Sequence, residues 1–98
     1  MVTRIVKMTF RNESCEEFLA IFHKYKEQIR NTPGCLSLTL LREKENSPVF
    51  FTYSYWEDEV KLNQYRYSDT FAEVWPQTKA LFSAPAEAWT TDTLVYLP

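Results

Sequence analysis

The chain has 98 residues and a formal net charge of −2 at pH 7, with acidic and basic side chains mixed along its length. That length fits one domain spanning residues 1–98. No basic run marks a nucleic-acid surface, no apolar stretch approaches the ~20 residues of a membrane span, and the N-terminus lacks an apolar region of signal-peptide type. We therefore expect a cytoplasmic protein with neither nucleic-acid nor membrane partners.

Aromatic side chains are unusually abundant. They make up 16% of the chain, whereas glycine occurs once, at Gly34. Each Phe, Tyr or Trp buries about 150–250 Å², and a chain this short has a thin core of its own. The excess predicts a partner or a ligand pocket. Cys15 and Cys35 form no CxxC pair, which fits reduced thiols in the cytoplasm.

The first part of the chain predicts a strand followed by a helix. Residues 2–10 alternate in polarity and are rich in β-branched side chains, which is typical of a strand. Ser14 with Glu17 three residues later has the spacing of a capping box. The helix that follows is amphipathic, and residues 31–34 end it with proline and glycine. Its core-facing stripe consists of Phe18, Phe22, Tyr25 and Ile29.

The middle of the chain predicts a hairpin. Residues 35–43 and 49–56 are strands, and the turn at 45–48 between them is short. The second of these strands carries bulky side chains on both of its sides. One side presents Val49, Phe51, Tyr53 and Tyr55, and the other presents Phe50, Thr52, Ser54 and Trp56.

The second helical region is predicted in pieces. Asp58 can cap a first helix, and Ser68 can cap a second one. Pro76 is expected to break the region again and to begin a last short segment. Residues 89–97 form the final predicted strand.

The element order predicts an α+β, ferredoxin-like βαββαβ fold, with an antiparallel four-stranded sheet and both helical regions on one face. Helices can cover only one face of such a sheet, whereas residues 49–56 carry aromatic side chains on both. We therefore expect a homodimer through the open sheet face, with two sheets that close over a shared aromatic-lined interior.

This order and spacing resemble the antibiotic biosynthesis monooxygenase family of dimeric α+β barrels along nearly the whole chain. The segments that carry the resemblance are Thr3–Val6, Pro33–Cys35, Phe51–Glu57, Tyr65–Phe71, Trp75 and Ala86–Trp89. Characterised members oxidise hydroxylated aromatics or quinols with molecular oxygen, often without metal or flavin. The electron-rich substrate anion is then the reductant, and the protein orients it and stabilises the developing oxyanion.

The resemblance also implies site residues. Trp56 matches the tryptophan that ends the third strand of the family, and Tyr65 falls where many relatives have a histidine or tryptophan. Tyr65 would be the catalytic residue, donating a hydrogen bond to the substrate oxygen. Heme-degrading relatives place an iron-ligating histidine at the position of Trp75, which cannot ligate iron. We expect no heme, flavin or metal cofactor, since the chain also lacks a Gly-rich phosphate loop and a Cys/His cluster.

The candidate substrate-binding residues Tyr53, Trp56, Trp75 and Arg4 each have a structural alternative. The tryptophans could pack in the core or line the pocket, and Tyr53 could lie at the interface or in the cavity. Arg4 shares a strand face with apolar side chains, so it is either part of a buried ion pair, which we favour, or an anion-binding group. His23, the single histidine, should point outward from its helix.

The leading functional hypothesis is a cofactor-independent monooxygenase that oxidises a small hydroxyaromatic or quinol. The chain has no obvious general base, and two alternatives stay open for that reason. One is a non-catalytic dimer that binds a small aromatic ligand. The other is a different reaction, such as isomerisation or decarboxylation, on the same barrel.

Overall fold

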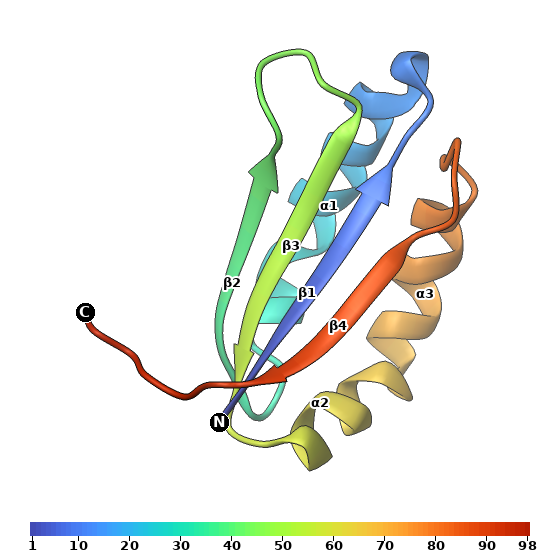
Figure 1. Cartoon of the computed structure of the whole chain (residues 1–98). Helices are drawn as coiled ribbons and strands as arrows, with labels where there is room; N and C mark the ends of the chain where they lie inside the picture. Colours follow the sequence, from blue (N-terminus) through green and yellow to red (C-terminus); the bar gives the residue numbers. More distant parts are fainter.

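The computed structural model describes residues 1–98 and has four strands and three α-helices. They are β1 (Val2–Thr9), α1 (Cys15–Arg30), β2 (Cys35–Arg42), β3 (Val49–Trp56), α2 (Glu59–Arg66), α3 (Asp69–Lys79) and β4 (Glu87–Asp92). The strands form one antiparallel sheet in the order β2-β3-β1-β4, and the helices lie together behind one of its faces (Figure 1). The predicted α+β, ferredoxin-like fold is confirmed.

Strand β3 lies inside the sheet, paired with β1 on one side and β2 on the other. Alternation along the strand sends Trp56 toward the helices, where it is 1% exposed, and Tyr53 toward the opposite face, where it is 43% exposed. The two-sided pattern read from the sequence is therefore present, and the face of Tyr53 has no helix over it (Figure 1).

The core on the helix side consists of two separate groups of buried side chains. The larger group comprises Met8, Phe10, Cys15, Phe18, Phe50 and Leu81. The smaller group comprises Val2, Cys35, Trp56 and Leu62. The shorter side chains Thr52 and Ser54 separate these groups along β3. The helices bridge this stretch of the sheet without filling the space above it, which leaves room for a cavity.

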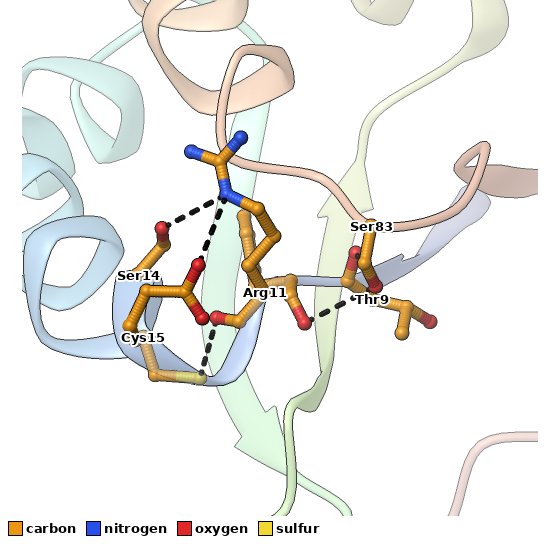
Figure 2. A network of polar contacts seen from close by, with 7 residues as sticks. Thr9, Arg11, Ser14, Cys15 and Ser83 are labelled. Atoms are coloured by element: carbon orange, nitrogen blue, oxygen red, sulfur yellow. Dashed lines mark hydrogen bonds and ion pairs between the residues drawn. The ribbon is translucent and has the colours of Figure 1, made fainter.

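The start of α1 differs from the predicted capping box. A 3-10 turn (Asn12–Ser14) precedes the helix, so Ser14 already has near-helical backbone angles and its hydroxyl makes no capping bond. Instead, Ser14 Oγ accepts a hydrogen bond from Arg11 Nε at 3.3 Å, and Cys15 Sγ donates to the Arg11 carbonyl oxygen at 3.7 Å (Figure 2). The local turn therefore replaces the cap.

The starts of α2 and α3 agree with the sequence. Asp58 Oδ1 accepts from the backbone N–H of Lys61 at 2.8 Å, and Ser68 Oγ accepts from that of Phe71 at 3.2 Å. The predicted break at Pro76 is wrong, because this proline lies inside α3. Ala72, four residues earlier, is exposed, so the carbonyl oxygen that loses its N–H partner can bind water.

The last strand is shorter than predicted. Strand β4 ends at Asp92, which pairs with Val2 at the beginning of β1. Beyond this point β1 offers no further residues for pairing, apart from the Met1 carbonyl oxygen that accepts from Thr93 N at 3.2 Å. The apolar residues 94–97 therefore leave the sheet and run across its end, past β2, and Tyr96 stacks on Tyr55 of β3 at 6.2 Å between ring centroids (Figure 1).

Candidate functional site

A cavity of about 330 Å³ lies between the helix-covered face of the sheet and the three helices. This volume is in the range that holds a small aromatic molecule. Most of its lining residues are hydrophobic. The sheet contributes Arg4, Val6, Met8, Leu38, Thr52, Ser54, Trp56 and Ala88, and the helices contribute Phe18, Phe22, Ile29, Leu62, Tyr65, Arg66, Phe71, Val74, Trp75 and Thr78.

The cavity lies within one chain, on the helix-covered face of the sheet, and the predicted interior between two sheets would lie on the opposite face. The sheet side of the cavity consists partly of the short side chains Thr52, Ser54 and Ala88. The helices above these residues leave space, so the cavity forms between the sheet and the helices of a single chain.

Four aromatic rings form a connected row along the wall of the cavity, one from the sheet and three from the helices. The rings of Trp56 and Tyr65 stack at 5.2 Å between centroids, Tyr65 meets Phe71 edge-on at 5.4 Å, and Phe71 stacks on Trp75 at 5.6 Å. The row runs from the end of β3 across α2 to α3. It offers flat apolar surface against which a planar ligand can stack.

Trp56 is fixed by a hydrogen bond inside this row. Its indole Nε1–H donates to Ser54 Oγ at 2.9 Å, and both residues are buried. They are two positions apart on β3, so their side chains lie on the same face of the sheet. The bond satisfies the one polar atom of the indole and holds the ring in place.

Tyr65 has a hydroxyl group that makes no hydrogen bond to any protein group, although the ring is packed between Trp56 and Phe71. Burial, with a smaller contribution from Cys35, raises the pKa of Tyr65 to about 12. The phenol is therefore protonated at neutral pH. It can donate a hydrogen bond to a ligand in the cavity and is a poor base.

Arg4 lines the cavity without an acidic partner. Its Nη1 donates to Thr90 Oγ1 on the neighbouring strand at 2.7 Å, and the chain's single ion pair joins Arg11 to Glu13 elsewhere. The predicted ion pair of Arg4 is therefore wrong, and the anion-binding alternative stays a prediction. Burial and then the positive charge of Arg66 lower the pKa of Arg4 below its usual value.

Tyr53 does not reach the cavity. It pairs with Ile5 and Thr39 in the sheet and lies on the open face, opposite Trp56. The prediction that it binds substrate beside Trp56, Trp75, Arg4 and Tyr65 is therefore not supported, and its interface alternative remains. Tyr53 and Trp56 are three positions apart on β3, so their side chains point to opposite faces, and the helices cover the face of Trp56.

Sequence reasoning missed Arg66 as a cavity residue. It follows Tyr65 directly and lies four positions after Leu62, a buried residue that also lines the cavity. Residues at this spacing share a helix face, so Arg66 could have been identified once Leu62 was assigned to the core.

Other candidate groups lie outside the cavity. His23 is exposed on α1, as predicted, and its ring nitrogen lies 3.2 Å from Lys26 Nζ. No group of three or more His, Cys, Asp or Glu side chains is arranged to hold a metal ion. None of the helices is long and apolar enough to cross a membrane.

Comparison with known proteins gives a consistent picture. The family model described as antibiotic biosynthesis monooxygenase matches residues 1–75. The chain superposes on Rv0793 of Mycobacterium tuberculosis with a TM-score of 0.88 at 18% identity, over 99% of this chain and 98% of that one. It superposes on SnoaB, a cofactor-independent oxygenase from Streptomyces nogalater, with a TM-score of 0.84 at 21% identity, over 99% and 96% of the two chains.

Among curated proteins, an uncharacterised protein of Synechocystis is 26% identical over 72 residues. The match takes in 74% of this chain and 49% of the Synechocystis protein. The chain thus spans about half the length of the curated relative that it matches.

Proposed function

The chain belongs to the antibiotic biosynthesis monooxygenase family, and from this premise we propose that it is a cofactor-independent monooxygenase for a small hydroxyaromatic or quinol. The observation that carries the proposal is the cavity under the sheet. It combines a row of aromatic rings with polar donors that have no acidic partner. The similarity in fold to SnoaB, itself a cofactor-independent oxygenase, also supports it.

The proposed reaction balances without an external reductant. A ring C–H of the phenol becomes C=O, one atom of O2 enters the product, and the other atom leaves as water. Oxidation of the phenol to the quinone releases four electrons, and reduction of O2 consumes four. The substrate anion passes the first electron to O2, the two radicals then join in a C–O bond, and loss of water from the resulting peroxide gives the quinone.

The residues in the cavity have distinct parts in this proposal. Trp56 and Trp75 hold the substrate ring by stacking, and the apolar lining excludes water from the reacting anion. Tyr65 donates a hydrogen bond from its free hydroxyl to the substrate oxygen as negative charge develops there. Donors of this kind act strongly in a site of low dielectric constant.

The direct test is oxygen uptake by purified, metal-free protein over a panel of hydroquinones and naphthols. We expect consumption of one O2 per quinone formed, and one labelled oxygen atom in the product when 18O2 is supplied. No uptake with any compound of the panel, or release of hydrogen peroxide in place of water, would contradict the proposed reaction.

A second candidate is a non-catalytic protein that binds a small aromatic ligand. The observation that favours it is the lack of Asp, Glu or His among the residues of the cavity, so that no side chain is available as a general base. A ligand that raises the melting temperature without being oxidised would favour this candidate.

The proposed assembly is a homodimer through the open sheet face. Leu41, Tyr53 and Trp89 point to that face and are 47%, 43% and 47% exposed. Three large apolar side chains on one face of a single sheet are typical of a surface that a partner covers. A second copy of the chain is the proposed partner, and a cytoplasmic location stays a prediction.

A further inference from the structure

The cavity contains two positive charges and no negative one. Arg4, on β1, and Arg66, at the end of α2, both belong to its lining, and no Asp or Glu does. Like charges repel, and the partial burial of Arg4 adds a desolvation penalty for that residue, so its charge is disfavoured in the empty protein, whereas Arg66 is exposed. A bound anion would offset both the repulsion between the arginines and the desolvation penalty.

Arg4 keeps most of its hydrogen-bonding capacity for such an anion. One of its nitrogens donates to Thr90 Oγ1, and the guanidinium makes no other bond to the protein. The Thr90 bond fixes the side chain against the neighbouring strand. The remaining N–H groups are donors only and cannot be satisfied by the apolar lining.

The cavity also lacks a group that could remove a proton from a phenol. Its ionisable residues are Arg4, Arg66 and Tyr65, and the Tyr65 phenol is protonated at neutral pH because burial raises its pKa to about 12. A phenol that reacts as its anion must therefore lose its proton to solvent and be retained by the protein in the ionised state.

We propose that Arg4 and Arg66 select the ionised form of an aromatic ligand, so that electrostatic stabilisation of a phenolate in this cavity takes the place of a general base. This inference deepens the proposed function, since it names the state in which the substrate binds. The ring stacks against the aromatic row, and the anionic oxygen faces the two guanidinium groups. Selection of the anion requires only binding and can be measured without turnover.

The probe is 4-nitrophenol, whose ionised form is yellow and whose pKa lies near neutrality. We expect excess protein to lower the apparent pKa of the bound probe, so that the yellow form persists at more acidic pH. The uncharged analogue 4-nitroanisole has the same ring and should bind more weakly than nitrophenolate. A charge-assisted hydrogen bond accounts for about a tenfold preference or more.

Substitutions separate the arginines from general charge effects. Arg4→Gln and Arg66→Gln should each lower the affinity for nitrophenolate about tenfold and leave that for 4-nitroanisole unchanged. Arg11→Gln removes the same charge outside the cavity, where Arg11 pairs with Glu13, and should alter neither affinity. Arg66 is exposed, so its variant tests the inference even if Arg4→Gln folds poorly.

The results distinguish this inference from the proposed function. Equal affinity for nitrophenolate and 4-nitroanisole, no binding of either probe, or unchanged selectivity in Arg66→Gln would overturn the inference. Selective binding of nitrophenolate together with no oxidation of any phenol would support the inference and contradict the oxygenase. Oxidation that proceeds at wild-type rates in both arginine variants would support the oxygenase and contradict the inference.

Discussion

The indole of Trp56 and the phenol of Tyr65 stack at 5.2 Å between ring centroids, with 27° between their planes. One ring comes from the end of β3 and the other from α2, so the contact ties the helix to the sheet at the wall of the cavity. Its consequence is that the Tyr65 hydroxyl is carried on a ring that cannot swing freely. A donor fixed in this way can act on a developing charge without first having to be reoriented.

Tyr65→Phe should therefore reduce turnover of the best phenolic substrate by about 10²–10³. The ring stays and only the hydroxyl is lost, so the melting temperature should change little. Turnover and a melting curve for both proteins test this. Tyr67→Phe is the matched control, because Tyr67 follows two residues later and is 91% exposed. Equal turnover in wild type and Tyr65→Phe would remove this hydroxyl from the mechanism.

The same tyrosine predicts a pH dependence of stability. The pKa of Tyr65 is about 12 in the folded chain and ~10 in the unfolded chain. Between these values the unfolded chain loses a proton that the folded chain keeps, so the free energy of unfolding should fall as pH rises from about 10 to about 12. Denaturant unfolding at several alkaline pH values should show a smaller fall in Tyr65→Phe. An equal fall of the unfolding free energy with pH in wild type and Tyr65→Phe would contradict a raised pKa for the Tyr65 phenol.

Ser54→Ala should destabilise the fold by about 1–3 kcal/mol, because it leaves the buried Trp56 Nε1–H without an acceptor. Chemical denaturation measures this loss. In a Trp56→Phe background the donor is absent, so the same serine substitution should have a smaller effect. An equal loss in both backgrounds would show that the hydroxyl stabilises the fold in another way.

Gly34→Ala should be more destabilising than an ordinary surface change. Gly34 has a φ of 88°, and a Cβ added there would collide with the side chain of Lys61 on α2. Asn46→Ala is the matched control, since Asn46 also has a positive φ, of 66°, but lies in the turn between β2 and β3. At Gly34 the added Cβ introduces about 1 kcal/mol or more of backbone strain, and the collision adds to it, whereas Asn46 already carries a Cβ, so that Asn46→Ala should change stability less. Equal melting temperatures for the two variants would contradict the close approach between Gly34 and the Lys61 side chain.

Trp89→Lys should dissociate the proposed homodimer. Trp89 pairs with Ile5, which pairs with Tyr53, so the three side chains form one apolar row across the open face. A charge buried there without a partner is costly. Sedimentation at micromolar concentration should give a dimer for wild type and for the exposed control Tyr67→Lys, and a smaller species for Trp89→Lys. A monomeric wild type would contradict the assembly directly.

Local patterns in the sequence were sufficient for most of the fold. The alternation of side chains predicted both ends of β3 correctly. Asp58 and Ser68 cap their helices as predicted, because capping depends on neighbours two or three residues away. The resemblance to the monooxygenase family is confirmed as well. The errors at Ser14 and Pro76 concern places where a preceding turn or solvent around the helix alters the usual rule.

The site was harder to predict than the fold. Trp56, Trp75, Tyr65 and Arg4 all line the cavity, whereas Tyr53 lies on the other side of the sheet. Which face of β3 the helices cover is decided by packing across the whole domain. The alternation is the same whichever face is covered, so the sequence of the strand alone cannot assign Tyr53. The unpaired state of Arg4 likewise depends on distant residues, because any partner would have to come from another element.

The three tryptophans are divided between the two surfaces of the sheet, since Trp56 and Trp75 line the cavity and Trp89 lies on the open face. Their fluorescence therefore reports two separate events. A nitrophenol bound against the aromatic row would quench the emission of the first two, whereas a second chain over the open face would shield Trp89 from a soluble quencher such as iodide. In a Trp89→Phe variant, emission reports the filling of the cavity alone.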